Sequence, residues 1–340
     1  MSPEQRERYS RQIVLPEIGE EGQQRLLRST AAIVGCGALG SLQAQALARA
    51  GVGCLILVDR DYLELSNLQR QWLYEESDLQ EDLPKAVTAA RRLARINSGI
   101  ELRPVVADLS PSNIADALAG AGVILDGTDN FETRYLINDY CVRHGIPWIY
   151  GAALGAYGIT MPIVPGRSAC LKCLYPEPPT PPLPTCETAG ILNAVTSAVA
   201  SIQTADALKL LCGAGHLLRL RITVMDLWEG RIRQVEQPGP QEDCPACAGR
   251  VFSHLQAVRR APITLCGRNA VQIHEDPRPV DLGELARRLA PLGEVKVTPF
   301  ALRFRIPPYE LTVFADNRVI VKGVGDPGVA RSLYARYIGN

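Results

Sequence analysis

Hydrophobic positions in the first 150 residues form short, β-branched apolar runs that alternate with segments of helical periodicity. Strands that alternate with helices are typical of parallel pairing through right-handed crossovers. The pattern predicts an α/β fold with a doubly wound, Rossmann-like and mostly parallel sheet. The predicted strands are residues 31–35, 54–59, 101–106, 123–126 and 148–150, and the clearest helix is 41–50.

The pattern changes beyond residue 150. The proline-rich stretch YPEPPTPPLP at residues 175–184 excludes helix and strand pairing, so we expect an extended crossover connection there. An apolar helix is predicted at 191–211, and its polar Gln203, Asp206 and Lys209 favour a packed core helix over a membrane span. Residues 219–236 are predicted to form a hairpin that turns near Glu229 and Gly230.

A fresh pattern begins near residue 263 and predicts a separate, small C-terminal α/β domain. Its expected strands are 271–274, segments near residues 295, 304 and 313, and 319–322, and its expected helices are 282–289 and 329–337. We therefore expect a first domain over residues 1–249, a linker over 250–262 and the small domain over 263–340.

Charge and composition argue against nucleic-acid binding, membrane attachment and a disulfide-linked fold. Lysine plus arginine (36) balance aspartate plus glutamate (36), so no global field attracts nucleic acid or an anionic membrane, and a nucleic-acid partner is not expected. The charged N-terminus lacks a signal-peptide core, and no stretch reaches the roughly 18 apolar residues of a membrane span, so we expect a cytoplasmic protein. The ten cysteines are then expected to be thiols or metal ligands rather than disulfides.

A glycine-rich string marks the first candidate site. AAIVGCGALGS places Gly35, Gly37 and Gly40 between an apolar strand and a helix, where backbone N–H groups at the helix N-terminus can bind phosphate. Asp59 ends the next strand, where a Rossmann-like unit uses a carboxylate to bind ribose hydroxyls. These residues alone suit an NAD-dependent oxidoreductase and an ATP-using enzyme equally well.

Charged and polar groups beyond that strand favour ATP. Attack at the α-phosphorus of ATP needs cations against the developing negative charge and a carboxylate that holds magnesium. Taken singly, Arg70 and Lys85 could be surface charges, and Asp126 or Asp129 could be helix caps. The groups available for this chemistry are Asp61, Asn67, Arg70, Lys85, Asp126 and Asp129.

Motifs along residues 6–249 carry a resemblance to a known family. RYSRQI, GCGALG, DRD, SNLQRQ, PK, GTDN and two CxxC pairs occur in the order seen in the ThiF/MoeB family of ubiquitin-activating-like enzymes, which this chain resembles. The resemblance implies an ATP-dependent adenylyltransferase. In that family the C-terminal Gly-Gly carboxylate of a ubiquitin-like sulfur carrier attacks ATP, which yields an acyl adenylate and pyrophosphate.

The same resemblance implies residue roles. Asp59 would hold the ribose, and Asp129 would hold the magnesium ion. Arg11 matches an arginine that reaches into the ATP site of a partner subunit, which implies a homodimer. The chain has DLPK where many relatives carry a glycine near the proline, so we expect a local difference in loop shape. The groups expected at the phosphates are Asn67, Arg70 and Lys85, with Asp61 beside the phosphates or the metal.

Four cysteines suit a metal site. Cys170 with Cys173, and Cys244 with Cys247, form two CxxC pairs whose spacing is typical of a tetrahedral structural zinc site. Zinc would join the start of the proline-rich crossover to the end of the first domain. A redox-active CxxC is the main alternative, and the presence of two pairs with few histidines nearby favours the metal.

Cys186 in LPTCETAG matches a mobile-loop cysteine of the family, which accepts the activated carboxylate or joins a persulfide linkage. Attack of its thiolate on an acyl adenylate is chemically reasonable, and a passive thiol is the equal alternative. The remaining cysteines are expected to be small core residues. These are Cys36, Cys54, Cys141, Cys212 and Cys266; the histidines, which show no ligand spacing, are His144, His216, His254 and His274.

The leading hypothesis is activation of a ThiS-like or MoaD-like carrier for thiamine, molybdopterin or tRNA thiolation. The last 80 or so residues resemble the extension of some bacterial ThiF-type proteins, which favours thiamine biosynthesis. The tail does not resemble a rhodanese domain, so a separate sulfur donor such as a cysteine desulfurase is expected. The alternatives are an NAD-dependent oxidoreductase, a non-catalytic scaffold and a tRNA-directed adenylating relative.

Overall fold

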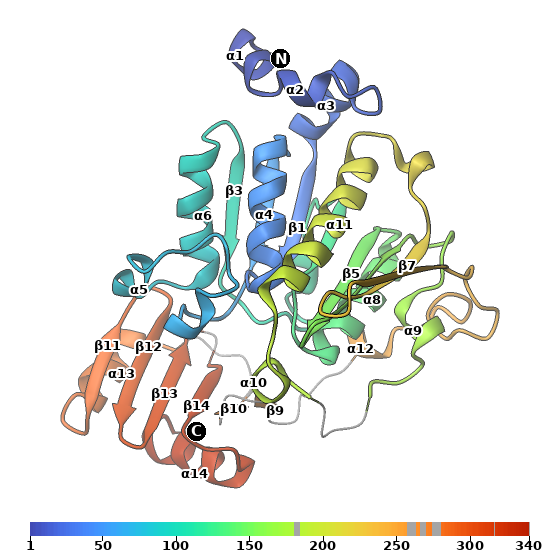
Figure 1. Cartoon of the computed structure of the whole chain (residues 1–340). Helices are drawn as coiled ribbons and strands as arrows, with labels where there is room; N and C mark the ends of the chain where they lie inside the picture. The colour runs from blue at the N-terminus through green and yellow to red at the C-terminus, as the bar shows by residue number, and fades with distance from the viewer. Residues whose placement is uncertain (180–183, 257–262, 266–269, 274–279, 316, 340) are drawn as a thin grey trace. The chain divides into compact units, whose positions relative to one another are not determined.

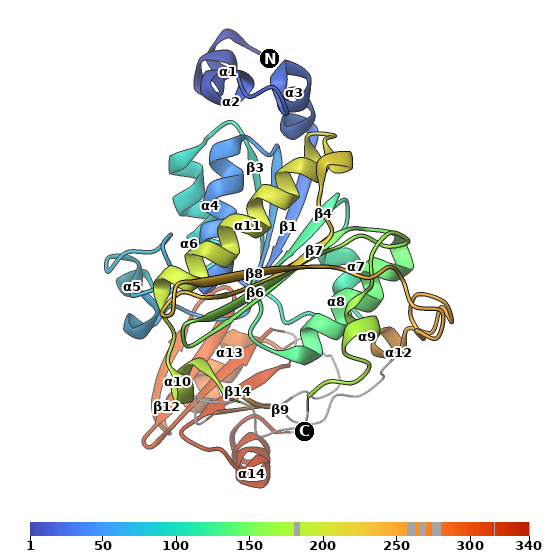
Figure 2. The ribbon, with the colours of Figure 1, turned by 45° about the vertical axis from the view of Figure 1, so that its right-hand side comes forward.

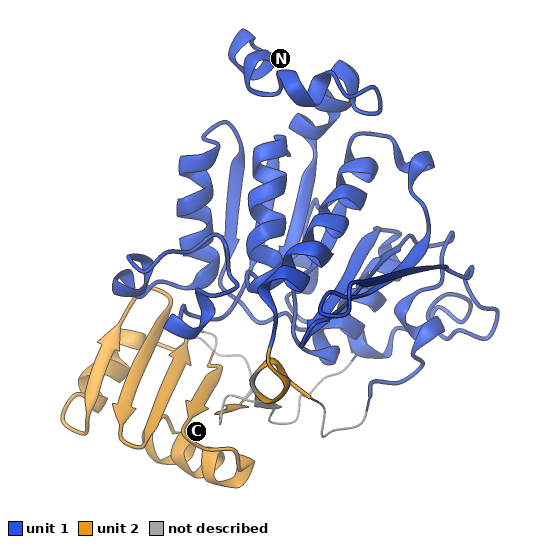
Figure 3. Cartoon of the chain, in the orientation of Figure 1, with its two compact units in different colours: residues 1–183, 191–256 blue, residues 184–190, 257–340 orange. Residues whose placement is uncertain are grey.

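The structure is a computed structural model, which describes residues 1–179, 184–256, 263–265, 270–273, 280–315 and 317–339. The chain forms two compact units (Figure 3). The first comprises Met1–Leu183 and Ile191–Gln256, and the second comprises Pro184–Gly190 and Ala257–Asn340. The division into 1–249, 250–262 and 263–340 remains our proposal for the domain boundaries.

The first unit is built on an eight-stranded sheet with the order β3-β2-β1-β4-β5-β6-β7-β8. Strands β3 to β5 pair in parallel, and β6, β7 and β8 add an antiparallel extension. The predicted mostly parallel α/β sheet is therefore confirmed. The strands are β1 (Thr30–Val34), β2 (Cys54–Val58), β3 (Glu101–Val105), β4 (Val123–Asp126), β5 (Trp148–Leu154), β6 (Tyr157–Ile163), β7 (Arg221–Asp226) and β8 (Arg231–Glu236).

Side-chain alternation along the central strands builds a core on each face of the sheet. On β1, Ala32 and Val34 pack with α8, whereas Ala31 and Ile33 pack with α4 and α6. Because both faces are covered, β2 is a continuous apolar run, CLILV, that is buried throughout. Figures 1 and 2 show the helices α4 (Ala38–Ala50), α6 (Lys85–Ile96) and α11 (Asn193–Leu211) on one face and α7 (Ile114–Ala117) and α8 (Phe131–His144) on the other.

The predicted core helix and hairpin are also confirmed. Helix α11 packs along α4, β5 and β6, and no helix in the described part of the chain is long and apolar enough to cross a membrane. Strands β7 and β8 form the expected hairpin. Strand β6 was not predicted, because its alternation is short and interrupted by Gly158. Residues 175–179 form neither helix nor strand, and residues 180–183 of the proline-rich segment lie outside the described residues.

Three short helices precede β1 and lie at the edge of the sheet where the parallel strands begin (Figure 1). They are joined to that edge by hydrogen bonds. The side chain of Gln12 donates to the carbonyl of Ala50 at 2.9 Å, and the Asn97 amide donates to the Tyr9 hydroxyl at 2.9 Å. The three are α1 (Pro3–Arg8), α2 (Ser10–Ile13) and α3 (Gly19–Arg28).

The second unit contains a six-stranded sheet in the order β11-β12-β13-β14-β10-β9, in which every described pairing is antiparallel. One sheet face packs against α13 and α14 to form a separate core that includes Val271, Phe304 and Leu333. The predicted C-terminal strands and helices are confirmed within the described residues. They are β10 (Ala270–Ile273), β11 (Glu294–Val297), β12 (Ala301–Ile306), β13 (Tyr309–Phe314), β14 (Val319–Lys322), α13 (Leu282–Leu289) and α14 (Pro327–Tyr337). Strand β9 (Ile263–Leu265) was not predicted.

Short elements complete the chain. The 3-10 helix η1 (Leu65–Asn67) and α5 (Asp78–Glu81) lie between β2 and α6. Helix α9 (Leu171–Leu174) contains Cys173 of the first CxxC pair, and α12 (Ser253–Gln256) follows the second pair. The remaining elements are α10 (Cys186–Ala189) and the 3-10 helix η2 (Gly215–Leu217).

Candidate nucleotide site and four-cysteine cluster

Three loops of the first unit meet at the carboxyl edge of the parallel strands. The glycine-rich loop follows β1, Asp59 follows β2, and Asp126 ends β4. Because β1 lies between β2 and β4, the chain leaves β1 toward β2 and later returns to its other side. Ligands of doubly wound sheets bind at this kind of switch point.

The three positions of the loop are occupied by glycine for different structural reasons. Gly35 has a φ of 89°, and a Cβ there would lie 2.5 Å from the carbonyl oxygen of Gly127. A Cβ on Gly40 would collide with the carbonyl oxygen of Gly35. At Gly37, the N-cap of α4, the nearest atom to a Cβ would be Gln71 Nε2, at 3.9 Å. Gly35 and Gly40 thus serve chain packing, and Gly37 faces open space at the helix N-terminus, where phosphate can bind.

Asp59 is tied to the same loop by backbone N–H groups. Cys36 and Asp61 each donate a backbone hydrogen bond to one carboxylate oxygen of Asp59, both at 2.7 Å. Burial raises the pKa of Asp59, and the positive charge of Lys85 opposes that shift. The carboxylate predicted to bind ribose therefore lies directly beside the loop predicted to bind phosphate.

Lys85 begins α6 at this edge, with only 3% of its side chain exposed. Its ammonium lies 3.6 Å from the carboxylate of Asp61, and its backbone N–H donates to the Asp61 carbonyl at 2.7 Å. A β-bridge between Tyr62 and Pro84 closes the same loop. Asp82, in the DLPK segment, has a φ of 51°, the left-handed region that glycine favours and aspartate tolerates. The loop thereby keeps Lys85 at the site without a glycine.

Asn67 and Arg70 follow in the segment between β2 and α5. Asn67 is 6% exposed in η1, where its side-chain oxygen accepts the Glu64 N–H at 3.2 Å. Arg70 is half-buried and donates to the Ser66 carbonyl at 2.8 Å. The structure thus places both residues after Asp59 and Asp61 in the segment that precedes Lys85.

The two aspartates of LDGTDN differ in their surroundings. Asp126 is fully buried, and its carboxylate accepts hydrogen bonds from the Thr128 N–H and hydroxyl and forms a 3.0 Å ion pair with Arg134. Both of its oxygens are therefore engaged within the chain, and the assignment of magnesium to Asp129 remains our proposal. Asp129 is exposed, and Asn130 is the N-cap of α8, so neither aspartate is the predicted helix cap.

Sequence reasoning missed Arg134. Its guanidinium joins the ends of β4 and β5, because it bonds Asp126, the Thr128 carbonyl at 2.7 Å and the Gly151 carbonyl at 3.0 Å. The signal in the sequence was an arginine in a helix that buries most of its residues, and it becomes informative only once the helix is placed over the aspartate.

Arg11 is exposed on α2, at the edge where the strands begin. Its neighbour Gln12 bonds Ala50, the last residue of α4, whereas the glycine-rich loop lies at the first turn of α4. The 13 residues of α4 span about 20 Å. An arginine side chain does not cover that distance, so Arg11 does not reach the glycine-rich loop of its own chain.

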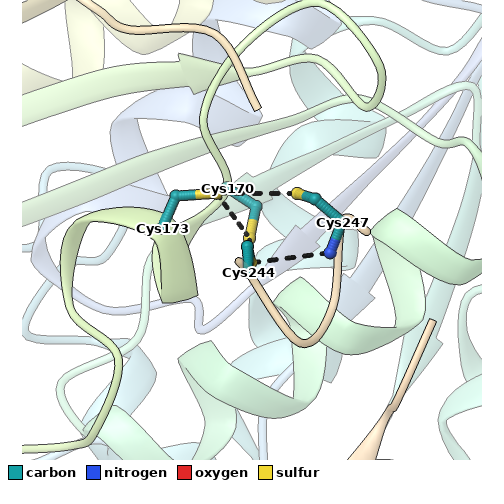
Figure 4. Close-up of side chains that lie close together, drawn as sticks. All are labelled: Cys170, Cys173, Cys244 and Cys247. Atoms are coloured by element: carbon teal, nitrogen blue, oxygen red, sulfur yellow. Dashed lines mark hydrogen bonds between the residues drawn. The ribbon is translucent and has the colours of Figure 1, made fainter. Parts of the chain in front are cut away.

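The four CxxC cysteines form a compact cluster (Figure 4). Their sulfur atoms lie within 4.8 Å of one another, and three Sγ–Sγ distances are 3.7 Å (Cys170 to Cys244), 3.8 Å (Cys170 to Cys173) and 3.6 Å (Cys173 to Cys247). A zinc ion with four Zn–S bonds of about 2.3 Å implies sulfur separations of about 3.8 Å. Without a cation, burial raises the pKa of the Cys173 thiol to about 11. The donor set and spacing therefore fit a tetrahedral thiolate site.

Helix α8 bonds the segment of the first CxxC pair and helix α12, which follows the second pair, through residues that sequence reasoning missed. The Asn138 amide donates to Cys170 Sγ at 3.7 Å and accepts the Leu171 N–H at 2.8 Å. Asp139 pairs with Lys172 at 2.8 Å and accepts the His254 N–H at 3.0 Å. Burial alone would raise the pKa of Asp139, but these hydrogen bonds and the Lys172 charge hold it below its ordinary value.

The other described cysteines are not among the four of this cluster. Cys186 is partly exposed at the start of α10, whose N-cap is Thr185. Cys36, Cys54, Cys141 and Cys212 are buried, as predicted. Cys266 and His274 lie outside the described residues. None of the nine described cysteines forms a disulfide bond.

The chain is similar to a known adenylyltransferase along nearly its whole length. The chain is 41% identical over 336 residues to the sulfur carrier protein ThiS adenylyltransferase of Bacillus subtilis, across 98% of this chain and 99% of the relative. It is also 41% identical to the SAMP-activating enzyme E1 of Haloferax volcanii, across 72% of this chain and 89% of that protein.

The solved structures that resemble this one include Escherichia coli MccB in complex with MccA-N7isoASN. That chain superposes with a TM-score of 0.63 at 23% identity, across 73% of this chain and 75% of MccB, which shows a shared fold. Residues 9–246 match the ThiF family over most of the first unit. Together with the whole-length similarity to the Bacillus enzyme, this match shows that the chain belongs to the ThiF family.

Proposed function

We propose that this protein is an adenylyltransferase that activates the C-terminal carboxylate of a ubiquitin-like sulfur carrier protein with ATP. The observation that carries the proposal is the position of Asp59, Asp61 and Lys85 beside the open N-terminus of α4. This arrangement occurs in a chain that matches a ThiS adenylyltransferase along 98% of its length.

In the proposed reaction a carboxylate oxygen of the carrier attacks the α-phosphorus of ATP. A carboxylate-to-phosphorus bond forms, the bond from the α-phosphorus to the bridging oxygen breaks, and pyrophosphate leaves with the electron pair. The product is an acyl adenylate, whose carbonyl is open to attack by a sulfur nucleophile. Negative charge gathers on the phosphate oxygens during this step, so fixed cations and N–H donors accelerate it.

Each candidate residue has a separate role in binding ATP. Asp59 accepts hydrogen bonds from the ribose hydroxyls. The first N–H groups of α4, beside Gly37, donate hydrogen bonds to a phosphate. Lys85 and Arg70 neutralise polyphosphate charge, and Asn67 donates an amide hydrogen bond. The exposed carboxylate of Asp129 is the hard oxygen ligand that suits magnesium, which would offset charge on the polyphosphate.

The four-cysteine cluster has a structural role in this proposal. Zinc bound by Cys170, Cys173, Cys244 and Cys247 would join the segment before the proline-rich crossover to the segment after β8. A site with four protein thiolates keeps no open position for substrate, so it stabilises the fold without taking part in adenylation.

The proposed assembly is a homodimer, in which Arg11 serves the site of the other subunit. Its distance from the glycine-rich loop of its own chain supports this arrangement. Cys186 is proposed as the thiol that accepts the activated carboxylate or a sulfur atom, and its partial exposure is compatible with that role. A separate sulfur donor such as a cysteine desulfurase would complete the pathway. The name of the Bacillus relative favours a ThiS-like carrier. The resemblance of the last 80 or so residues to the extension of ThiF-type proteins favours thiamine biosynthesis.

The test is exchange of labelled pyrophosphate into ATP. We expect exchange only when a ThiS-like carrier with an intact Gly-Gly terminus is present, because the carboxylate is the nucleophile. A carrier that lacks the two glycines is the matched control and should support no exchange. Exchange without any carrier would contradict the proposal, and saturable NAD binding without ATP binding would favour the oxidoreductase alternative.

A further inference from the structure

Arg134 of α8 is a buried cation that holds the loop between β4 and α8, which carries Asp129. Only 6% of its side chain is exposed. Its Nε donates to an oxygen of the Asp126 carboxylate at 3.0 Å, and its Nη2 donates to the carbonyls of Thr128 at 2.7 Å and Gly151 at 3.0 Å. A side chain this buried does not meet a substrate directly, so any role of Arg134 in the reaction acts through the residues that it holds.

The shape of the arginine side chain suits this arrangement. Its planar guanidinium offers N–H donors in a rigid fork, whereas a lysine ammonium is a compact point charge. The centres of the Phe131 and Tyr150 rings lie 5.4 Å and 5.2 Å from the guanidinium carbon of Arg134, at distances typical of cation–π contacts. The fork is therefore held by packing as well as by hydrogen bonds.

The start of the β4–α8 loop is fixed against the rest of the site. The Asp126 carbonyl accepts hydrogen bonds from the side chains of Gln43 at 3.1 Å and Gln203 at 2.9 Å. The next residue, Gly127, packs so closely against the glycine-rich loop that a Cβ there would lie 2.4 Å from the carbonyl oxygen of Gly35. The loop that carries the proposed metal ligand is thus packed directly against the loop that is proposed to bind phosphate.

Thr128 connects this fixed start to Asp129. Its N–H and hydroxyl donate to the Asp126 carboxylate at 2.9 Å and 2.7 Å, and its carbonyl accepts from Arg134. Asp129 itself is exposed. The peptide group that leads into Asp129 is therefore bonded to the guanidinium, so a change at Arg134 would displace the exposed carboxylate.

Arg134 also sets the charge of this loop. Burial alone would lower the pKa of Arg134, but the negative charges of Asp126 and Asp129 help to hold that pKa above its ordinary value, so the guanidinium stays positive. The ion pair neutralises the buried carboxylate of Asp126, whereas the carboxylate of Asp129 lies at the surface, where a cation can reach it. The loop thereby offers its negative charge to a metal at one place.

We propose that Arg134 is a positioning residue for magnesium. It holds the β4–α8 loop in the shape that presents the Asp129 carboxylate to the metal ion of bound Mg–ATP. This inference rests on the proposed function for the identity of the nucleotide and for the role of Asp129. Replacement of a residue that orients a metal ligand without touching the metal typically costs about 10–100-fold in metal affinity or activity.

Arg134→Lys tests this role, because lysine keeps the positive charge but does not reproduce the planar fork. Mn²⁺ is the probe, since its binding is visible by electron paramagnetic resonance. It is titrated in the presence of an ATP analogue whose methylene bridge between the α- and β-phosphorus atoms cannot be cleaved. We expect the variant to bind Mn²⁺ about tenfold more weakly than wild type and to bind the metal-free analogue equally well.

Arg92→Lys is the matched control. Arg92 is 15% exposed and forms a 2.9 Å ion pair with Asp78, and its described partners lie at residues 75–78 rather than in the β4–α8 loop. This variant should leave the Mn²⁺ affinity unchanged. A second test variant combines Arg134→Gln with Asp126→Asn, which removes both buried charges together and leaves neither without compensation. It should also bind Mn²⁺ about tenfold more weakly, so the inference stays testable if Arg134→Lys does not fold.

A magnesium titration of carrier-dependent pyrophosphate exchange separates positioning from support of the fold. In Arg134→Lys we expect the magnesium concentration for half-maximal rate to rise about tenfold, with much of the rate recovered at saturating magnesium. A lower melting temperature with unchanged Mn²⁺ affinity and an unchanged magnesium requirement would overturn the inference, because a purely structural role changes stability alone. If wild type binds Mn²⁺ with the analogue but catalyses no exchange, the proposed function fails, and the Mn²⁺ comparison still decides the role of Arg134.

Discussion

At the scale of single residues, Asp139 shows how a buried charge is held by several partners. Its carboxylate is fully buried and meets the ammonium of Lys172 at 2.8 Å and the His254 N–H at 3.0 Å. Lys172 is itself 4% exposed and lies between two cysteines of the cluster. Removal of one partner leaves the other charge buried without compensation, so such pairs are much more sensitive to substitution than surface ion pairs.

We predict that Asp139→Asn lowers the free energy of unfolding by about 3–5 kcal/mol at pH 7. The pKa of Asp139 is lowered in the folded state, so its stabilisation is fully present above the unfolded-state pKa of about 3.9 and is lost as the pH falls through the lower folded-state value. The difference between wild type and variant should therefore be constant from pH 7 to about 5 and shrink below about pH 4.

Denaturant unfolding across this pH range measures the difference. Asp116→Asn on the exposed face of α7 is the control and should leave the free energy of unfolding nearly unchanged. A difference between wild type and Asp139→Asn that grows toward acid pH would contradict the assigned direction of the pKa shift.

At the scale of elements, the sequence predicted those features whose partners lie near one another in the chain. The glycine-rich loop, the carboxylate at the end of the next strand and the two CxxC pairs all have short-range spacing that carries their meaning. The ion pair of Arg134 with Asp126 and the contact of Asn138 with Cys170 depend on how helix α8 lies over the sheet. No local pattern encodes that placement, so these groups became visible only in the folded chain.

Two glycines of the same loop should respond differently to alanine. Gly40→Ala forces a Cβ against the Gly35 carbonyl, so we expect a loss of about 1–3 kcal/mol in the free energy of unfolding. A Cβ in Gly37→Ala meets only an ordinary van der Waals contact, with Gln71 Nε2 at 3.9 Å, so stability should stay within about 0.5 kcal/mol while ATP affinity falls about tenfold. Thermal unfolding and ATP titration measure both effects, and wild-type ATP affinity in Gly37→Ala would show that the phosphate lies elsewhere.

The cysteine cluster should behave as a structural metal site. We expect one zinc ion per chain by elemental analysis, and chelation or Cys170→Ala should lower the melting temperature because the metal joins two distant segments. Cys141→Ala removes a buried cysteine outside the cluster and should retain the zinc. Metal-free protein with an unchanged melting temperature, or a disulfide within either CxxC pair, would favour the redox alternative.

At the scale of the whole molecule, two units divide the chain. The first unit contains the switch point of the parallel sheet, the candidate nucleotide site and the cysteine cluster, and residues 9–246 of the chain match the ThiF family. The second unit has its own antiparallel sheet and core, and the similarity to the Bacillus enzyme extends through it. Cys186 is grouped with this second unit, whereas the proposed ATP residues belong to the first.

The most direct test of the central claim is the intact mass of the carrier after reaction. The protein would be incubated with ATP, magnesium and a ThiS-like carrier, and the carrier would then be examined by mass spectrometry. We predict an added adenylyl group on the carrier, formed together with pyrophosphate and absent when the terminal glycines are removed. A carrier of unchanged mass, with a protein that binds ATP and is fully folded, would contradict the account.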